Sequence, residues 1–230
     1  MLNDIKVSVN QASTSAFLSK KYSFPILLAF LIAFFNQFSG INFVLYYAPR
    51  IFEKAGLAAG EVLGASVPIG IFNLIFTLLG MYLIDKVGRK KLMYAGSIGY
   101  ILSLSGVAWT FFSGAEGFFV VLFISAFIAS HAVGQGAVIW VFISEIFPNS
   151  VRDSGMSLGA GTHWICAAII TLVTPTVLGA FSGGTIFVFF AGMMVLQLLF
   201  VWKLMPETKN KTLEELEKEL LPKESEFSNP

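Results

Sequence analysis

Three amide side chains lie close together in one apolar segment near the start of the chain: Asn36, Gln37 and Asn42. An amide donates and accepts hydrogen bonds without carrying charge, so this cluster suits a neutral ligand that is rich in hydroxyl groups. Because a polar side chain in hydrocarbon is costly without a partner, the three amides should face protein or water. The Ser39-Gly40 pair between them predicts a loosened helix beside a cavity. A sugar is the first ligand that this chemistry suggests.

The composition indicates that the amides lie in a membrane. Hydrophobic residues make up 56% of the 230 residues and charged residues 13%, whereas roughly 25% of an ordinary soluble domain is charged. Six apolar segments each approach or exceed the roughly 20 residues that cross a bilayer. They are residues 23–48, 60–84, 92–112, 118–146, 150–178 and 185–204. The sequence therefore predicts an all-α membrane protein with six transmembrane helices.

Lysine and arginine predict the orientation and the domain limits. Most of the fifteen basic residues lie in the two tails, in the loop 85–91 and near Arg152, whereas the opposite loops hold Arg50 and Lys54. Because basic loops favour the cytoplasm, we expect both termini there. The expected parts are a cytoplasmic segment 1–22, a transmembrane domain 23–205 and a cytoplasmic tail 206–230. In the tail, Thr212-Leu213-Glu214-Glu215 is typical of a capping box that opens a short amphipathic helix.

Glycine beside polar residues interrupts the first and the fourth apolar segments, at Ser39-Gly40 and at Gly134-Gln135-Gly136. Interrupted helices at matching positions in two triplets of spans are a sequence pointer to a transport site, and they predict a 3+3 inverted repeat. We find no nucleophile–base pair, no metal-ligand spacing and no phosphate-binding loop in the sequence. We therefore expect no enzymatic activity, no catalytic residue, no cofactor and no metal.

Four motifs resemble those of one family, the sugar porters of the major facilitator superfamily. They are Gln37-Phe38-Ser39-Gly40-Ile41-Asn42 with Tyr46-Tyr47, Asp85-Lys86-Val87-Gly88-Arg89-Lys90-Lys91, Ser144-Glu145-Ile146-Phe147-Pro148 with Arg152, and Pro206-Glu207-Thr208-Lys209. The resemblance runs from about Lys21 to Leu221 and follows the motif order of the family's C-terminal half, as in bacterial proton–xylose symporters and glucose facilitators. It implies one half of a twelve-helix major facilitator fold in the plasma or inner membrane.

The resemblance also implies partners. A neutral monosaccharide, a hexose or a pentose, is the expected ligand, and membrane lipids surround the chain. An N-terminal six-helix half is expected to complete the transporter, and nucleic acid is not an expected partner. The chain is then a fragment or one product of a split gene, and self-pairing of two copies is the alternative.

Seven residues are implied as sugar contacts: Asn36, Gln37, Asn42, Asn73, Trp140, His163 and Trp164. An indole such as Trp140 offers a flat apolar face for a pyranose and one N–H donor. His163-Trp164 stands where relatives have Gln-Trp or Asn-Trp, so His163 either replaces an amide as a sugar contact or adds pH sensitivity. The alternative for the amides, and equally for Asn73, is a hydrogen bond between neighbouring helices. His131 is expected to pack within the fourth span.

A second set of residues is implied in gating: Tyr46, Tyr47, Asp85, Arg89, Glu145, Arg152 and Glu207. The charged members are expected to meet on the cytoplasmic face, where ion pairs between helix ends would hold that side shut. The two tyrosines resemble outer-gate residues, or they anchor the helix at the membrane interface. Relatives often have proline where Ala137 follows Gly136, so the fourth span is expected to be less kinked, with flexibility from Gly134 and Gly136.

Together these features predict monosaccharide transport by alternating access, as a uniporter or a proton symporter, with this chain supplying the C-terminal half. Two alternatives belong to other classes: a membrane sugar sensor that does not transport, and a major facilitator exporter of another small solute. Gln37 and Asn42 argue against the exporter, whose site would be apolar or charged. The tail that ends at Pro230 disfavours the sensor, which would carry a longer one.

Overall fold

The computed structural model describes residues 17–115 and 117–222, and within these ranges every regular element is helical. The elements are η1 (Lys20–Tyr22), α2 (Ser23–Phe38), α3 (Ile41–Lys54), α4 (Ala59–Val87), α5 (Arg89–Ser113), α6 (Gly117–His131), η2 (Ala132–Gly136), α7 (Ala137–Ile146), α8 (Arg152–Ala180), α9 (Gly183–Lys203) and α10 (Leu213–Leu220). Most of the predicted cytoplasmic segment 1–22 and the end of the predicted tail lie outside the described residues.

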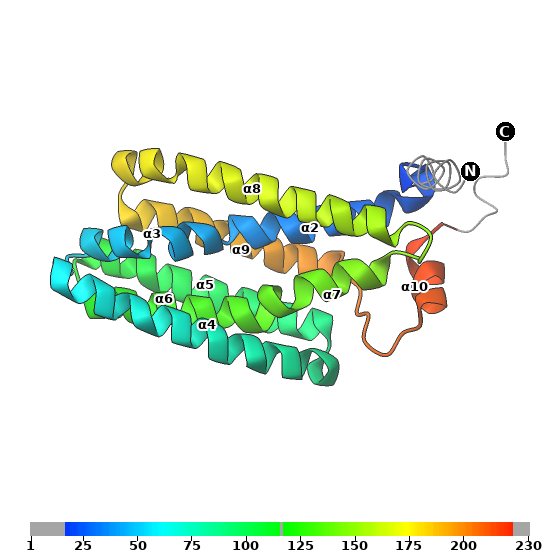
Figure 1. The fold of residues 1–230 in the computed structure, drawn as a ribbon, viewed down its shortest axis with the longest axis horizontal. Coiled ribbons are helices and arrows are strands. Elements are labelled where there is room, and N and C mark those ends of the chain that lie inside the picture. Colours follow the sequence, from blue (N-terminus) through cyan, green and yellow to red (C-terminus); the bar gives the residue numbers. More distant parts are fainter. Residues whose placement is uncertain (1–16, 116, 223–230) are drawn as a thin grey trace, which may run out of the picture.

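Six helical stretches are long and apolar enough to cross a membrane, which confirms the predicted number of spans. The first is α2 with α3, the fourth is α6 with η2 and α7, and the other four are single helices. Figure 1 shows them side by side as an elongated bundle, with α10 at the end where α7 and α9 finish. Large apolar side chains such as Leu74, Leu102 and Leu172 are exposed on the flanks, as a surface in contact with lipid requires.

The first span breaks where Ser39-Gly40 predicted it. α2 ends at Phe38, and α3 begins at Ile41 after Gly40 adopts a left-handed conformation with φ of 84°. The Ser39 hydroxyl donates to the Asn36 carbonyl at 2.6 Å, which satisfies one backbone group that the broken helix leaves unpaired. The Phe190 ring of α9 packs directly against Gly40. The break is therefore held in place by a tertiary contact.

The fourth span is interrupted by a π-helical turn at Ala132–Gly136. π-helical turns are rare and are frequent at functional sites. Here α5 approaches closely, because a Cβ atom on Gly96 would lie 2.9 Å from the Gly134 Cα atom. Gly134 thus gives α5 room to pack, in addition to any flexibility that it gives the helix. The fourth span is therefore irregular even though alanine stands at position 137, where relatives often have proline.

Polar side chains tie the π-helical turn to its neighbours. Gln135 is fully buried and donates to the Gln197 side chain of α9. Gln197 in turn donates to the Ser97 hydroxyl of α5 at 2.8 Å. Such bonds join helices inside a membrane, where water cannot replace them. The interruption of the fourth span is consequently fixed to two helices.

The predicted helix in the tail is α10, and its capping box is present. The Thr212 hydroxyl accepts from the Glu215 amide at 3.2 Å, and the Glu215 carboxylate accepts from the Thr212 amide at 2.8 Å. Leu216 and Leu220 are buried and join the core cluster at this end of the bundle. A helix this short is marginal alone, so its packing against α7 is what stabilises it.

Candidate functional site

The break between α2 and α3 gathers the amides around one side chain, Gln37. The Gln37 Nε2 atom donates to Asn36 Oδ1 at 3.0 Å, and Gln37 Oε1 accepts from Asn42 Nδ2 at 2.8 Å. Both ring nitrogens of His163, on α8, lie 3.1 Å from Gln37 Nε2. We call these four residues the amide cluster.

Gln37 is the least accessible member of the amide cluster. It is fully buried and Asn36 is nearly so, whereas Asn42 and His163 are only partly buried. An amide has two donors and one acceptor oxygen, and the cluster engages both ends of Gln37. A ligand that bonds to Gln37 must therefore join or displace these partners, while Asn42 and His163 are the more accessible members of the cluster. The arrangement suits recognition of hydroxyl groups.

Aromatic rings flank His163. The Trp140 ring, on α7, lies 5.2 Å from the His163 ring between centroids, and the Trp164 ring lies 5.1 Å from it. Trp140 is partly buried beside the amide cluster, so its flat face is near the polar atoms as the resemblance implied. Trp164 is 62% exposed. Its ring shields His163 from one side and leaves most of its own surface open.

Asn73 stands apart from the amide cluster. It lies in α4, and its side chain makes no hydrogen bond with any residue in 17–115 or 117–222. The structure gives it neither the contact with the amide cluster nor the bond between helices that the sequence left open. Its part in sugar binding stays a prediction.

The two tyrosines of α3 differ in their surroundings. The Tyr47 hydroxyl donates to the Thr171 carbonyl of α8 at 3.1 Å, and the Arg50 guanidinium lies 5.8 Å from the Tyr47 ring. Tyr46 is 59% exposed. Tyr47 thus links α3 to α8, the two helices that carry Asn42 and His163, and its part in an outer gate stays a prediction.

Sequence reasoning missed Tyr100, which is fully buried on α5. Its hydroxyl lies 2.5 Å from the His131 Nδ1 atom. His131 therefore bonds to a neighbouring span, which corrects the expectation that it packs within its own. The signal was available, because a tyrosine and a histidine inside apolar spans each need a hydrogen-bonding partner.

On the far side of the bundle from α3, charged side chains meet around Arg89 at the start of α5. The Arg89 Nε atom donates to Glu145 Oε2 at 3.0 Å and Nη2 donates to Glu145 Oε1 at 2.6 Å, a two-pronged ion pair between α5 and α7. Arg89 is only 8% exposed. Glu145 Oε2 also accepts from the Thr208 hydroxyl at 2.6 Å. Asp85 is the outer partner, 3.0 Å from Arg89 Nη1 and largely exposed.

Glu207 takes a role that the sequence did not indicate. Its Oε1 atom accepts from the Arg89 backbone amide at 2.9 Å and its Oε2 atom accepts from the Lys90 amide at 3.1 Å. Free amides and the positive end of the helix dipole make a helix N-terminus favourable for a carboxylate. Glu207 therefore caps α5 and ties the segment after α9 to it.

Arg152 corrects the expectation that five charged residues meet. Among the described residues its guanidinium forms no ion pair, and its Nε atom is buried without a hydrogen-bond partner. The Glu145 carboxylate is engaged by Arg89 and Thr208 instead. The structure thus brings together Asp85, Arg89, Glu145 and Glu207.

Six helical stretches are long and apolar enough to cross a membrane, and two of them are broken beside polar side chains, which is typical of a multi-pass membrane protein. The family model described as sugar (and other) transporter matches residues 1–220. The D-xylose-proton symporter of Escherichia coli K12 is 35% identical over 84% of this chain and 40% of the symporter. The glucose transporter GlcP of Staphylococcus epidermidis is 36% identical over 85% of this chain and 44% of its own length.

Solved structures agree with these relatives. The structure of the proton:xylose symporter XylE bound to 6-bromo-6-deoxy-D-glucose matches with a TM-score of 0.77 and 31% identity, over 95% of this chain and 49% of that one. The chain belongs to the sugar porter family of the major facilitator superfamily, which comprises transporters and not enzymes. It spans about half the length, or somewhat less, of the relatives it matches.

Proposed function

We propose that this chain supplies the C-terminal six-helix half of a monosaccharide transporter that works by alternating access, as a uniporter or a proton symporter. The observation that carries the proposal is the amide cluster at the break between α2 and α3, near the middle of the span Lys20–Lys54. Broken helices near the midplane are where transporters of this type bind their substrate. Relatives that are named as transporters of xylose, glucose and arabinose support a hexose or a pentose as the substrate.

The proposal includes an arrangement in the membrane. Residues 23–205 form the transmembrane domain, and the segments 1–22 and 206–230 are cytoplasmic because the basic residues concentrate beside them. A second six-helix domain is the partner that completes the sugar site. On this orientation the ion pairs around Arg89 and the cap by Glu207 lie on the cytoplasmic side, where they link α5, α7 and the segment after α9.

Sugar binding is expected to depend on Gln37. Gln37→Ala should weaken it by roughly 1–3 kcal/mol, because Asn42 and His163 lose the partner that orients them. Isothermal titration with the chain joined to its partner half measures the change. Gln197→Ala is the matched control, since Gln197 is a buried glutamine of α9 that does not touch the amide cluster. Equal losses of sugar affinity in Gln37→Ala and Gln197→Ala would count against the amide cluster as the sugar site.

His163 is expected to make sugar binding sensitive to pH. A neutral imidazole accepts a hydrogen bond from Gln37 Nε2, whereas a protonated ring has donors only and must repel that group. Affinity should therefore fall as the pH drops through the range in which His163 gains a proton. His163→Gln keeps an acceptor and removes the titration, so its affinity should stay constant over that range. The same pH profile in both proteins would exclude His163 as the cause.

A further inference from the structure

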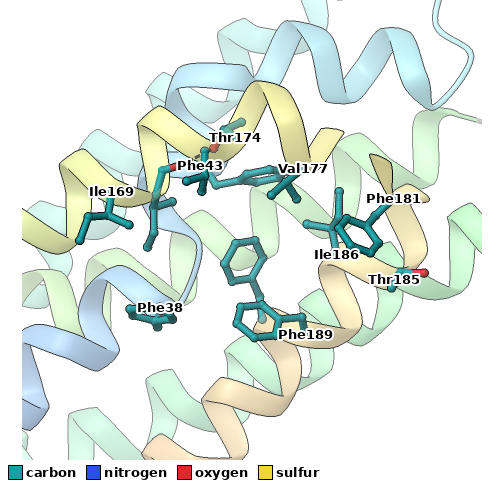
Figure 2. A pocket seen from close by; sticks show the side chains of 12 residues that line it. Phe38, Phe43, Ile169, Thr174, Val177, Phe181, Thr185, Ile186 and Phe189 are labelled. Carbon is teal, nitrogen blue, oxygen red and sulfur yellow. Dashed lines mark hydrogen bonds between the residues drawn. The ribbon is translucent and has the colours of Figure 1, made fainter. Parts of the chain in front are cut away.

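An apolar cavity of about 410 Å³ lies between α8 and α9. Figure 2 shows side chains of both helices pointing into it, with Thr174 and Val177 on one wall and Phe189 on the other. α8 packs mainly on α2, α3 and α7, and α9 packs mainly on α5 and α2. The cavity occupies the wedge that these two helices leave between them. Its volume falls in the range of about 300–1,000 Å³ that small-ligand sites occupy.

The cavity offers a ligand no free polar group in its walls. Its twelve lining residues include only two with polar side chains, Thr174 and Thr185. The Thr174 hydroxyl donates to the Ile170 carbonyl at 2.7 Å, and the Thr185 hydroxyl pairs with Ser182 at 2.8 Å. Polar ligands would lose hydrogen bonds on entering such a space. Only an apolar group fits it.

The cavity is separate from the amide cluster, although both adjoin the break in the first span. Gln37 and Asn42 belong to the amide cluster, whereas their chain neighbours Phe38 and Phe43 line the cavity. Phe190 also lines it and packs on Gly40. A molecule in the cavity would therefore press on the ring that holds the break between α2 and α3.

The shape of the cavity follows a lipid chain. Its lining runs from Ile169 on α8 to Phe181, the residue that follows the helix, which at 1.5 Å per residue is roughly 18 Å. One leaflet contributes about half of the roughly 30 Å hydrocarbon core. The mouth continues an apolar flank, because Ile169 and Phe189 are both more than half exposed. The lining is thus about as long as one leaflet is deep, and the mouth lies on an apolar surface of this chain.

A positive charge stands at one end of the cavity. The Lys54 ammonium donates to the carbonyl oxygens of Leu178 and Phe181, the latter at 2.8 Å, and Phe181 lines the cavity. An ammonium group has three donors, so one remains for another acceptor. At the end of a membrane helix this donor lies in the headgroup layer, where a lysine ammonium attracts a phosphate group.

We propose that the cavity binds one acyl chain of an anionic phospholipid whose phosphate group meets Lys54. The proposal needs only a membrane around the chain, so it stands or falls separately from sugar transport. A lipid bound here is a structural ligand of α8 and α9, and it supports the Phe190 contact with Gly40.

Native mass spectrometry of the full chain tests the proposal. The chain is extracted from vesicles of equal parts palmitoyl-oleoyl phosphatidylglycerol and palmitoyl-oleoyl phosphatidylcholine, and bulk lipid is then removed with detergent. The wild type should retain one phospholipid per chain, enriched in phosphatidylglycerol. Lys54→Gln should retain a lipid but lose the preference for phosphatidylglycerol, because the acyl site remains and the charge does not.

Two tryptophan variants of neighbouring residues separate the cavity from the general lipid surface. Val173→Trp fills the cavity and should lose the retained lipid, whereas Leu172→Trp, at a side chain that is 81% exposed, should keep it. Gel filtration and circular dichroism confirm that each variant is folded, and Ile169→Phe is a second filling variant. A lipid-free wild type would overturn the proposal, as would equal retention by a folded filling variant and Leu172→Trp.

Discussion

Replacing Glu145 with alanine is expected to lower the free energy of unfolding by up to about 3–5 kcal/mol, the range for removing one partner of a buried ion pair. Arg89 is only 8% exposed, and Glu145 engages it through two hydrogen bonds of 3.0 and 2.6 Å. Without Glu145 the guanidinium would keep the Ile84 carbonyl and the exposed Asp85 carboxylate as partners. Neither compensates the buried charge as Glu145 does.

Asp85 provides the matched control for Glu145. Both carboxylates face Arg89, but the Asp85 side chain is 80% exposed and the Glu145 side chain is 25% exposed. Exposed ion pairs contribute at most about 1 kcal/mol, so Asp85→Ala should change stability little. Denaturation of the purified chain in mixed micelles with increasing sodium dodecyl sulfate measures the change in unfolding free energy for both variants. Similar losses for Asp85→Ala and Glu145→Ala would show that burial does not set the strength of this network.

The second large effect is expected at Gly40. A left-handed backbone costs a residue with a Cβ atom about 1–2 kcal/mol, and φ at Gly40 is 84°. A Cβ atom there would also lie 2.9 Å from the Phe190 ring, and such overpacking costs about 1–3 kcal/mol. Gly40→Ala should therefore destabilise the chain through both causes and move the amide cluster, because Gln37 and Asn42 lie on opposite sides of the break.

Gly192→Ala is the control for Gly40→Ala. Gly192 lies inside α9, and a Cβ atom on it would meet nothing within 4 Å. Alanine is favoured over glycine in a helix by about 1 kcal/mol, so this variant should be neutral or more stable. Adding Phe190→Leu to Gly40→Ala should restore only the part of the lost stability that comes from the overlap of the new Cβ atom with the Phe190 ring. If Gly40→Ala behaves like Gly192→Ala in the same denaturation series, the break is not held by the contact with Phe190.

The spans were predictable because their signal is local. Each predicted segment coincides with one of the six helical stretches, and some helices extend further at both ends, as with residues 60–84 against α4 at Ala59–Val87 and 92–112 against α5 at Arg89–Ser113. Apolar windows stop at the first charged side chain, whereas a helix continues through Lys86 or begins at Arg89 because its ends reach the polar headgroup layer. The break at Gly40 was also predictable, since glycine next to serine weakens a helix locally.

The candidate site was predictable only in part. Gln37 and Asn42 are close in sequence, but their contact depends on the turn at Gly40, and their contact with His163 depends on how α8 packs on α2. The cap that Glu207 places on α5 was hidden because the two segments are far apart in the chain. The same holds for Arg152, whose lack of an ion pair within 17–115 and 117–222 depends on how distant segments pack.

The most direct measurement of the central claim is sugar uptake. Proteoliposomes that contain this chain together with an N-terminal six-helix half are supplied with radiolabelled xylose, glucose, galactose or arabinose, with and without an inward proton gradient. We expect saturable uptake of at least one sugar, reduced more by Gln37→Ala than by Gln197→Ala, and the response to the gradient separates symport from uniport. Sugar binding without uptake would contradict the transporter and favour the sensor. The absence of both binding and uptake would contradict the sugar site itself.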